Sequence, residues 1–182
     1  MKAPRTTTRS AVLLVSAALA IALIGTSCGA HPKSPPTAQG SGGTLLPATP
    51  AQLPTFDMAK FRMLLAQLRG TPVVVNIWAS WCGPCQVEAP NLASVARAYQ
   101  GKAQFLGVDI LDDRTHARAF IQTYGWPYPS VFDSGASIRH GLGLLAQPDT
   151  VVFDRNGKQV GVISGPASDA ALRQLLSKVV SP

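Results

Sequence analysis

The chemistry of this sequence is concentrated in two cysteines separated by a glycine and a proline, Cys82-Gly83-Pro84-Cys85. They follow a run of β-branched and aromatic residues at 73–78, which predicts a buried strand, and they precede a helical pattern that reaches about residue 99. The cysteines therefore open a helix, where first-turn N–H groups and the helix dipole stabilise the thiolate of Cys82 over its thiol. A thiol of lowered pKa is a good nucleophile and a good leaving group. We expect Cys82 to attack a disulfide, and Cys85, one turn further on and deeper, to pair with Cys82 and resolve the mixed disulfide.

Cysteines at this spacing also occur as half of a zinc site, which needs two more ligands at a suitable spacing. The other candidate ligands are scattered and form no paired motif. Two inert core thiols are a further alternative, but a strand-to-helix junction is an exposed place for them. We therefore expect neither a metal nor a cofactor. The scattered candidates are Cys28, His31, His116 and His140.

Glu88 lies three residues after Cys85, one helical turn along and on the same side of the helix. One interpretation is a solvated surface acid that gains only from the helix dipole. The other is a proton acceptor for Cys85, which must lose its proton before it resolves a mixed disulfide. Pro90, inside the same helix, removes a backbone donor and is expected to bend it.

The elements around the cysteines alternate in type. Strand 73–78, helix 83–99 and strand 103–111 predict a parallel βαβ unit with a right-handed crossover. Later in the chain, the turn sequence at 154–157 predicts an antiparallel hairpin that ends near residue 163. The other predicted elements are an amphipathic helix over 56–70 with Asp57 as N-cap, a helix beginning at 112, a short strand over 130–132, a turn or short helix over 141–146, and a last amphipathic helix over 168–180.

Two aromatic residues, Trp126 and Tyr128, stand in a proline-rich loop. They are interpreted either as lid residues near a substrate groove or as packing at the domain edge. His116, alone on its predicted helix, is interpreted as a surface residue.

The sequence WCGPC after VVVNIWAS resembles the active site of the thioredoxin-fold thiol–disulfide oxidoreductases, and the resemblance covers roughly residues 55–180. It implies an α/β fold with a central mixed β-sheet flanked by helices. It also implies that substrate contacts are made by residues around the nucleophile: Trp81, Gly83 and Pro84.

In the same family a cis-proline faces the cysteines just before a late strand, and Gln147-Pro148 occupies that place. Proline is the residue for which a cis bond costs little, and such a bond exposes the preceding backbone to an extended substrate. We therefore add Gln147 and Pro148 to the expected substrate-binding residues. The competing candidate for the cis bond is Pro129.

Asn76 stands where thioredoxins usually carry a buried Asp, and together with Glu88 it makes the chain resemble the membrane-anchored TlpA/ResA-type branch. The resemblance implies a reductant for exported cysteine-containing proteins, such as apocytochrome c, that is served by a membrane thiol–disulfide partner. Two alternatives stay open: a disulfide donor for the folding of exported proteins, and a lipid-anchored peptide- or metal-binding module.

Residues 1–30 are predicted to be a secretory signal, because basic residues at 2, 5 and 9 precede an apolar run at 11–24. Cys28 follows small residues and resembles the lipidated cysteine of bacterial lipoproteins. This implies a location on the extracytoplasmic face of the bacterial membrane. Cleavage after Ala30, or an uncleaved anchor, is the alternative.

Residues 31–54 are rich in Pro, Gly, Ser and Thr and are predicted to be a disordered tether, so that the domain itself spans 55–182. The formal net charge is +7, and it falls to +4 when the three basic residues of the first ten are removed. No run of Lys and Arg marks a nucleic-acid surface. We therefore expect no nucleic-acid partner.

Overall fold

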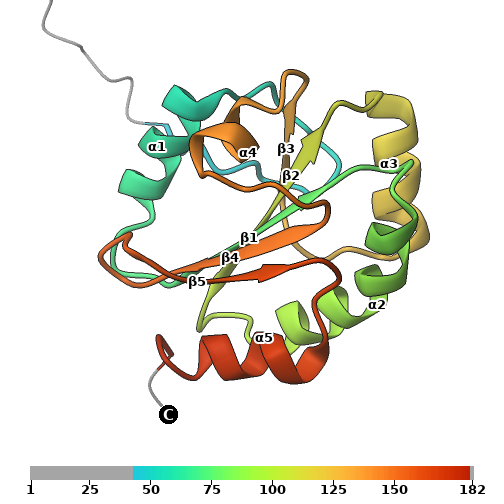
Figure 1. Ribbon diagram of the computed structural model, residues 1–182. Helices are drawn as coiled ribbons and strands as arrows, with labels where there is room; N and C mark the ends of the chain where they lie inside the picture. The colour runs from blue at the N-terminus through green and yellow to red at the C-terminus, as the bar shows by residue number, and fades with distance from the viewer. Residues whose placement is uncertain (1–42, 181–182) are drawn as a thin grey trace, which may run out of the picture. The chain divides into compact units, whose positions relative to one another are not determined.

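The computed structural model describes residues 43–180, in which a five-stranded mixed sheet carries helices on both faces (Figure 1). β1 (Val73–Trp78) lies at the centre, parallel to β2 (Gln104–Ile110) and antiparallel to β4 (Asp149–Phe153). β3 (Ser130–Asp133) pairs with β2 and β5 (Gln159–Ser164) pairs with β4, which gives the order β3-β2-β1-β4-β5. The predicted fold class, the parallel βαβ unit and the late hairpin are confirmed.

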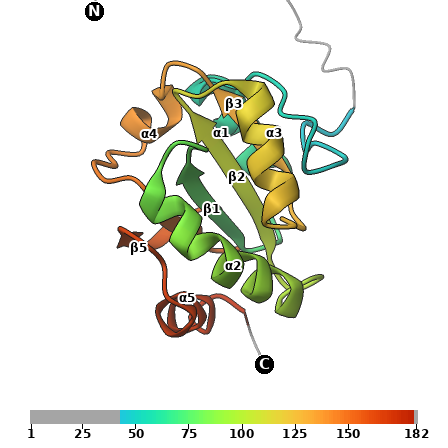
Figure 2. The same cartoon turned by 90° about the vertical axis from the view of Figure 1, so that its right-hand side faces the viewer.

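The side chains of β1 are all buried and alternate between two cores. Val74 and Trp78 belong to the core beneath α2, α3 and α5, whereas Val75 and Ile77 belong to the core beneath α1 and α4 (Figure 2). Because both faces of the strand are covered, the run is apolar apart from Asn76. The helices are α1 (Met58–Gln67), α2 (Gly83–Ala98), α3 (Arg114–Thr123), α4 (Ser137–Gly141) and α5 (Asp169–Leu176).

Besides α2, three helices begin at side-chain caps. Asp57 accepts from the Lys60 N–H at the start of α1, as predicted, and Asp113 and Ser168 cap α3 and α5 in the same way. α4 starts earlier than the predicted turn or helix over 141–146. The reason is the Asp133 carboxylate at the end of β3, which accepts from the Ile138 N–H at 2.7 Å and thereby begins the helix before residue 141.

Residues 43–54, which we expected to belong to the tether, pack against the domain. Leu53 is 1% exposed, and Leu45 and Leu46 lie against the core beneath α1. Phe132 of β3 donates its N–H to the Pro54 carbonyl, and Phe56 donates its N–H to the Phe132 carbonyl. The few leucines of this segment are enough to hold it against the domain. The prediction of a disordered tether is therefore wrong for residues 43–54.

The expected signal segment, Cys28 and the tether up to residue 42 lie outside the described residues. Between residues 43 and 180, no helix is long and apolar enough to span a bilayer. Trp126 and Tyr128 are buried and stack on each other with ring centroids 4.8 Å apart. They are packing residues, and the lid interpretation is wrong.

Candidate active site

Cys82 is the N-cap of α2, so the cysteines open a helix as predicted. The Sγ atom of Cys82 accepts from the Cys85 N–H at 3.2 Å, and the two residues are joined by a disulfide with their Cα atoms 5.2 Å apart. Cys82 is 4% exposed and Cys85 is fully buried. The relative depth of the two sulfurs is therefore as expected for an attacking and a resolving cysteine.

Trp81, Gly83 and Pro84 surround Cys82 and are all exposed, with Trp81 58% accessible. The indole N–H of Trp81 donates to the Leu111 carbonyl at 3.0 Å, which fixes the ring beside the disulfide. These three residues are thus available to a partner, and their role in substrate binding stays a prediction.

Glu88 is 1% exposed, so its interpretation as a solvated surface acid is wrong. Its carboxylate accepts from the Asn76 side-chain amide at 2.7 Å and from the Ala167 N–H at 2.7 Å. Burial raises the pKa of Glu88 from its ordinary 4.5 to about 7, and these two hydrogen bonds oppose that rise. A carboxyl group whose pKa lies near 7 can both take and return a proton at physiological pH.

Asn76 is the polar residue inside the otherwise apolar β1 strand, and the alternation of side chains turns it toward α2. Its amide also donates to the Thr150 hydroxyl of β4 at 3.1 Å. The structure thus gives Asn76 a specific position as a hydrogen-bond donor to Glu88.

The Gln147-Pro148 peptide bond is cis, as predicted, and the bond before Pro129 is not. The antiparallel pairing of β1 and β4 ends at Ile77 opposite Asp149. Gln147 and Pro148 stand directly before Asp149, so they lie toward the end of β1 from which the chain leads into Cys82.

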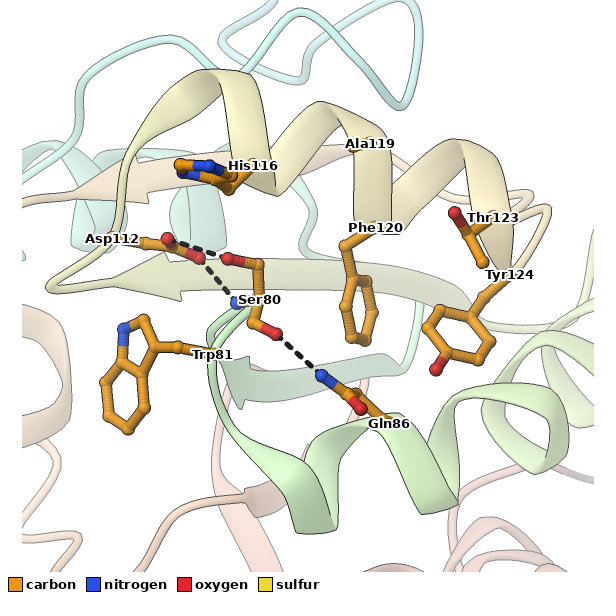
Figure 3. A pocket seen from close by; sticks show the side chains of 9 residues that line it. All are labelled: Ser80, Trp81, Gln86, Asp112, His116, Ala119, Phe120, Thr123 and Tyr124. Atoms are coloured by element: carbon orange, nitrogen blue, oxygen red, sulfur yellow. Dashed lines mark hydrogen bonds between the residues drawn. The ribbon is translucent and has the colours of Figure 1, made fainter.

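A groove of about 500 Å³ opens beside Trp81, between α2 and α3 (Figure 3). Phe120 and Tyr124 line it, while the Gln86 amide donates to the Ser80 carbonyl at 3.0 Å. Asp112 holds the loop before Cys82, because its carboxylate accepts from both the N–H and the hydroxyl of Ser80, the latter at 2.8 Å. This loop support was not predicted from the sequence.

Asp109, near the end of β2, is a buried carboxyl group that sequence reasoning missed. It is fully buried, and neither oxygen has a hydrogen-bond donor within the described part of the chain. Burial, together with the negative charge of Asp112, raises the pKa of Asp109 to about 9, so the group is neutral at pH 7. A charged residue type inside the apolar run over 103–111 was the available signal.

His116 is 77% exposed, in agreement with its surface interpretation. Among residues 43–180, no three His, Cys, Asp or Glu side chains are grouped so that they could hold a metal ion.

This redox pair, with a buried acid beside it and a cis-proline at its edge on a five-stranded mixed sheet, defines a thioredoxin-fold thiol–disulfide oxidoreductase. The family model described as AhpC/TSA matches residues 47–160, and the chain belongs to that family. The chain is therefore an enzyme, and the alternative of a binding module without redox chemistry does not hold.

Known relatives agree with this assignment. The chain is 28% identical over 116 residues to the thiol-disulfide oxidoreductase ResA of Geobacillus thermodenitrificans, covering 63% of this chain and 67% of that one. It is 34% identical over 119 residues to the thiol:disulfide interchange protein HelX of Rhodobacter capsulatus, covering 64% of each chain. Among solved structures, it is similar to a secreted Mycobacterium tuberculosis disulfide oxidoreductase homologous to E. coli DsbE. That match has a TM-score of 0.57 at 25% identity and covers 63% of this chain and 86% of that one.

Proposed function

We propose that this enzyme works outside the cytoplasm as a reductant of disulfides in exported proteins, with Cys82 as nucleophile, Cys85 as resolving thiol and Glu88 as proton acceptor. The observation that carries the proposal is the buried Glu88 carboxyl with a pKa of about 7, one helical turn from Cys85. A reductant has to deprotonate its buried second thiol in each turnover, and a group of this pKa is suited to that step at neutral pH.

The reaction begins from the dithiol. The Cys82 thiolate attacks one sulfur of the substrate disulfide, that disulfide bond breaks, and the first substrate sulfur leaves as a thiolate that takes a proton from water. Glu88 then accepts the proton of the Cys85 thiol, and the resulting thiolate attacks Cys82 Sγ. The mixed disulfide breaks, the second substrate thiolate leaves, and two electrons have passed from the enzyme to the substrate.

The substrate is expected to lie along Trp81, Gly83 and Pro84, which are exposed, and beside the half-buried Gln147 and the buried Pro148. Beyond the strand pairing that ends at Asp149, the backbone groups of Gln147 make no hydrogen bond within residues 43–180. They are free to pair with an extended substrate segment, in the manner of an added strand. A protein substrate with an exposed, extended segment around its cysteine fits this edge.

Location and partners complete the proposal. The signal segment at 1–30 and lipidation of Cys28 would place the domain on the extracytoplasmic face of a bacterial membrane, and a structure similar to this one belongs to a secreted oxidoreductase. Apocytochrome c is a fitting substrate, and a membrane thiol–disulfide protein would return electrons to the Cys82–Cys85 pair. Radiolabelled fatty acid incorporated by the wild type and not by Cys28→Ala tests the anchor.

The direction of electron flow is tested by the reduction potential of the Cys82–Cys85 pair in glutathione buffers, together with its redox state in cells. A strongly reducing potential and a resting dithiol are expected. An oxidising potential with a resting disulfide would contradict the proposal that the enzyme is a reductant and would favour disulfide donation. Cys82→Ser is the control, since it should abolish insulin-disulfide reduction in either case.

A further inference from the structure

A cluster of hydrogen-bond donors without acceptors lies beside the cis-proline. The side chain of Gln147 offers its oxygen to Arg139 Nη1 of α4 at 3.5 Å, while its Nε2 is buried without a partner. The Nε of Arg139 is likewise buried without a partner. Buried donors of this kind are rare in folded proteins because each one costs free energy unless it finds an acceptor.

Arg139 also has no counter-ion. Within residues 43–180, no carboxylate lies within 4.0 Å of its guanidinium, and the other group it touches is the ring of His140 at 3.4 Å. A half-buried guanidinium in this state has a fork of donors suited to a planar, negatively charged acceptor. A carboxylate is the acceptor whose charge and shape fit this fork best.

The position of the cluster decides where that carboxylate comes from. Gln147 directly precedes cis-Pro148, and Asp149 after it pairs with Ile77, five residues before Cys82, so the cluster lies toward the end of β1 that leads to the cysteines. Leu145, two residues before Gln147, is 95% exposed and offers an apolar contact on the same loop. The basic charge of the chain as a whole favours the approach of acidic segments as well.

We propose that Arg139 and Gln147 form a subsite that binds a carboxylate next to the reacting cysteine of the substrate and so selects substrates with an acidic group at that point. The carboxylate is either an Asp or Glu side chain or the C-terminus of the substrate chain. The inference rests on the proposed function, because the ligand is the disulfide substrate itself.

The subsite acts on specificity rather than on the redox step. A charge-assisted hydrogen bond that forms only with the acidic substrate is expected to change kcat/KM for that substrate by about 10-fold. The same bond is absent with a neutral substrate, so Arg139→Gln should leave reduction of a neutral peptide disulfide nearly unchanged.

The experiment compares peptide disulfides that differ at one position beside the cysteine, with Asp, Asn or Lys there, and a pair that ends in a free or an amidated C-terminus. Single-turnover exchange with the reduced enzyme gives kcat/KM for each, whichever direction the protein works in cells. We expect the Asp-to-Asn ratio to be about 10 in the wild type and near 1 in Arg139→Gln, with Arg139→Lys in between. The two C-terminal peptides tell which carboxylate is preferred.

Arg62→Gln is the matched control, because it removes one charge from α1 next to the hairpin turn at Asn156 and Gly157, at the opposite end of the sheet. It should keep the wild-type ratio. Equal rates for the Asp and Asn peptides in the wild type, or a ratio that survives Arg139→Gln, would overturn the subsite.

A second readout is independent of redox chemistry. Peptides in which serine replaces the cysteine are titrated into the oxidised protein, and the Arg139 Nε–H signal is followed by NMR. The signal should shift with the Asp peptide and not with the Asn peptide. If exchange failed with every peptide, the proposed function would be wrong, but this titration would still test the subsite. If the Arg139 signal did not shift with the acidic peptide, the subsite would be rejected.

Discussion

The Asn76 side-chain amide donates a 2.7 Å hydrogen bond to the Glu88 carboxylate, so that a residue of the central strand holds the acid of the cysteine helix in place. The bond joins the two elements that flank the Cys82–Cys85 disulfide, β1 and α2. It also favours the charged form of Glu88 against the larger opposing effect of burial. The pKa of Glu88 is thus held near 7 by two effects of opposite sign.

Glu88→Gln should slow resolution of the mixed disulfide by about 100-fold at pH 7 to 8, the usual contribution of a general base. In the wild type the rate should rise as pH passes through about 7, because the ionised form of Glu88 is the acceptor. The variant should lack that inflection. Stopped-flow measurement of product release across the pH range checks both effects, and a variant as fast as wild type at every pH would remove Glu88 from the mechanism.

Asn76→Ala should shift the same inflection to higher pH, since the lost hydrogen bond favours the ionised carboxylate. A displacement of about one pH unit corresponds to a hydrogen bond of about 1.4 kcal/mol. Thr150→Val is the control, because it removes the other contact of the Asn76 amide and leaves the bond to Glu88. A shift to lower pH in Asn76→Ala would contradict this account.

Asp109→Asn should raise stability at neutral and alkaline pH. The pKa of Asp109 is raised from 3.8 to about 9 in the folded chain, so its stabilising effect is complete below pH 4 and is lost as pH rises toward 9. Asparagine does not titrate and has no such loss, and about 1.4 kcal/mol per unit over the roughly four units from the unfolded pKa to pH 8 gives a gain on the order of 5 kcal/mol at pH 8. Urea unfolding at several pH values measures it; an unchanged pH slope would mean that Asp109 is not the titrating group.

Leu53→Ala should cost about 2–4 kcal/mol in the free energy of unfolding, as truncation of a buried leucine usually does. Leu145→Ala, at a side chain that is 95% exposed, is the matched control and should change stability by less than about 0.5 kcal/mol. Denaturant unfolding of both variants tests the packing of residues 43–54. If Leu53→Ala left the free energy of unfolding unchanged, residues 43–54 would have to be assigned to the tether after all.

The sequence predicted the parts of this enzyme that follow from local pattern. The strand before Cys82 and the helix after it depend on neighbouring residues and are present, and so is the cis bond at Pro148, which the resemblance to the thioredoxin family implied. Glu88 was identified by its spacing from Cys85, but its burial was not, because the covering residue Ala167 is far away in the sequence.

Other features depend on contacts that no short window contains. The donors of Arg139 and Gln147 come together through the packing of α4 near the loop before β4. Asp112 and Ser80 meet because β1 and β2 end side by side. The burial of Leu53 depends on β3, which lies almost eighty residues later in the chain.

The segment that leads into α1 lies along the outer side of β3, where Thr55 pairs with Phe132 and the main chain of Phe132 is bonded on that side as well. Unpaired strand edges invite association with other chains. A version of the protein cut to begin at residue 56 would keep its cysteines and yet expose the Phe132 main chain to any strand in solution. The residues before α1 therefore also protect the protein from self-association. The oligomeric state is the first property to measure in a shortened enzyme.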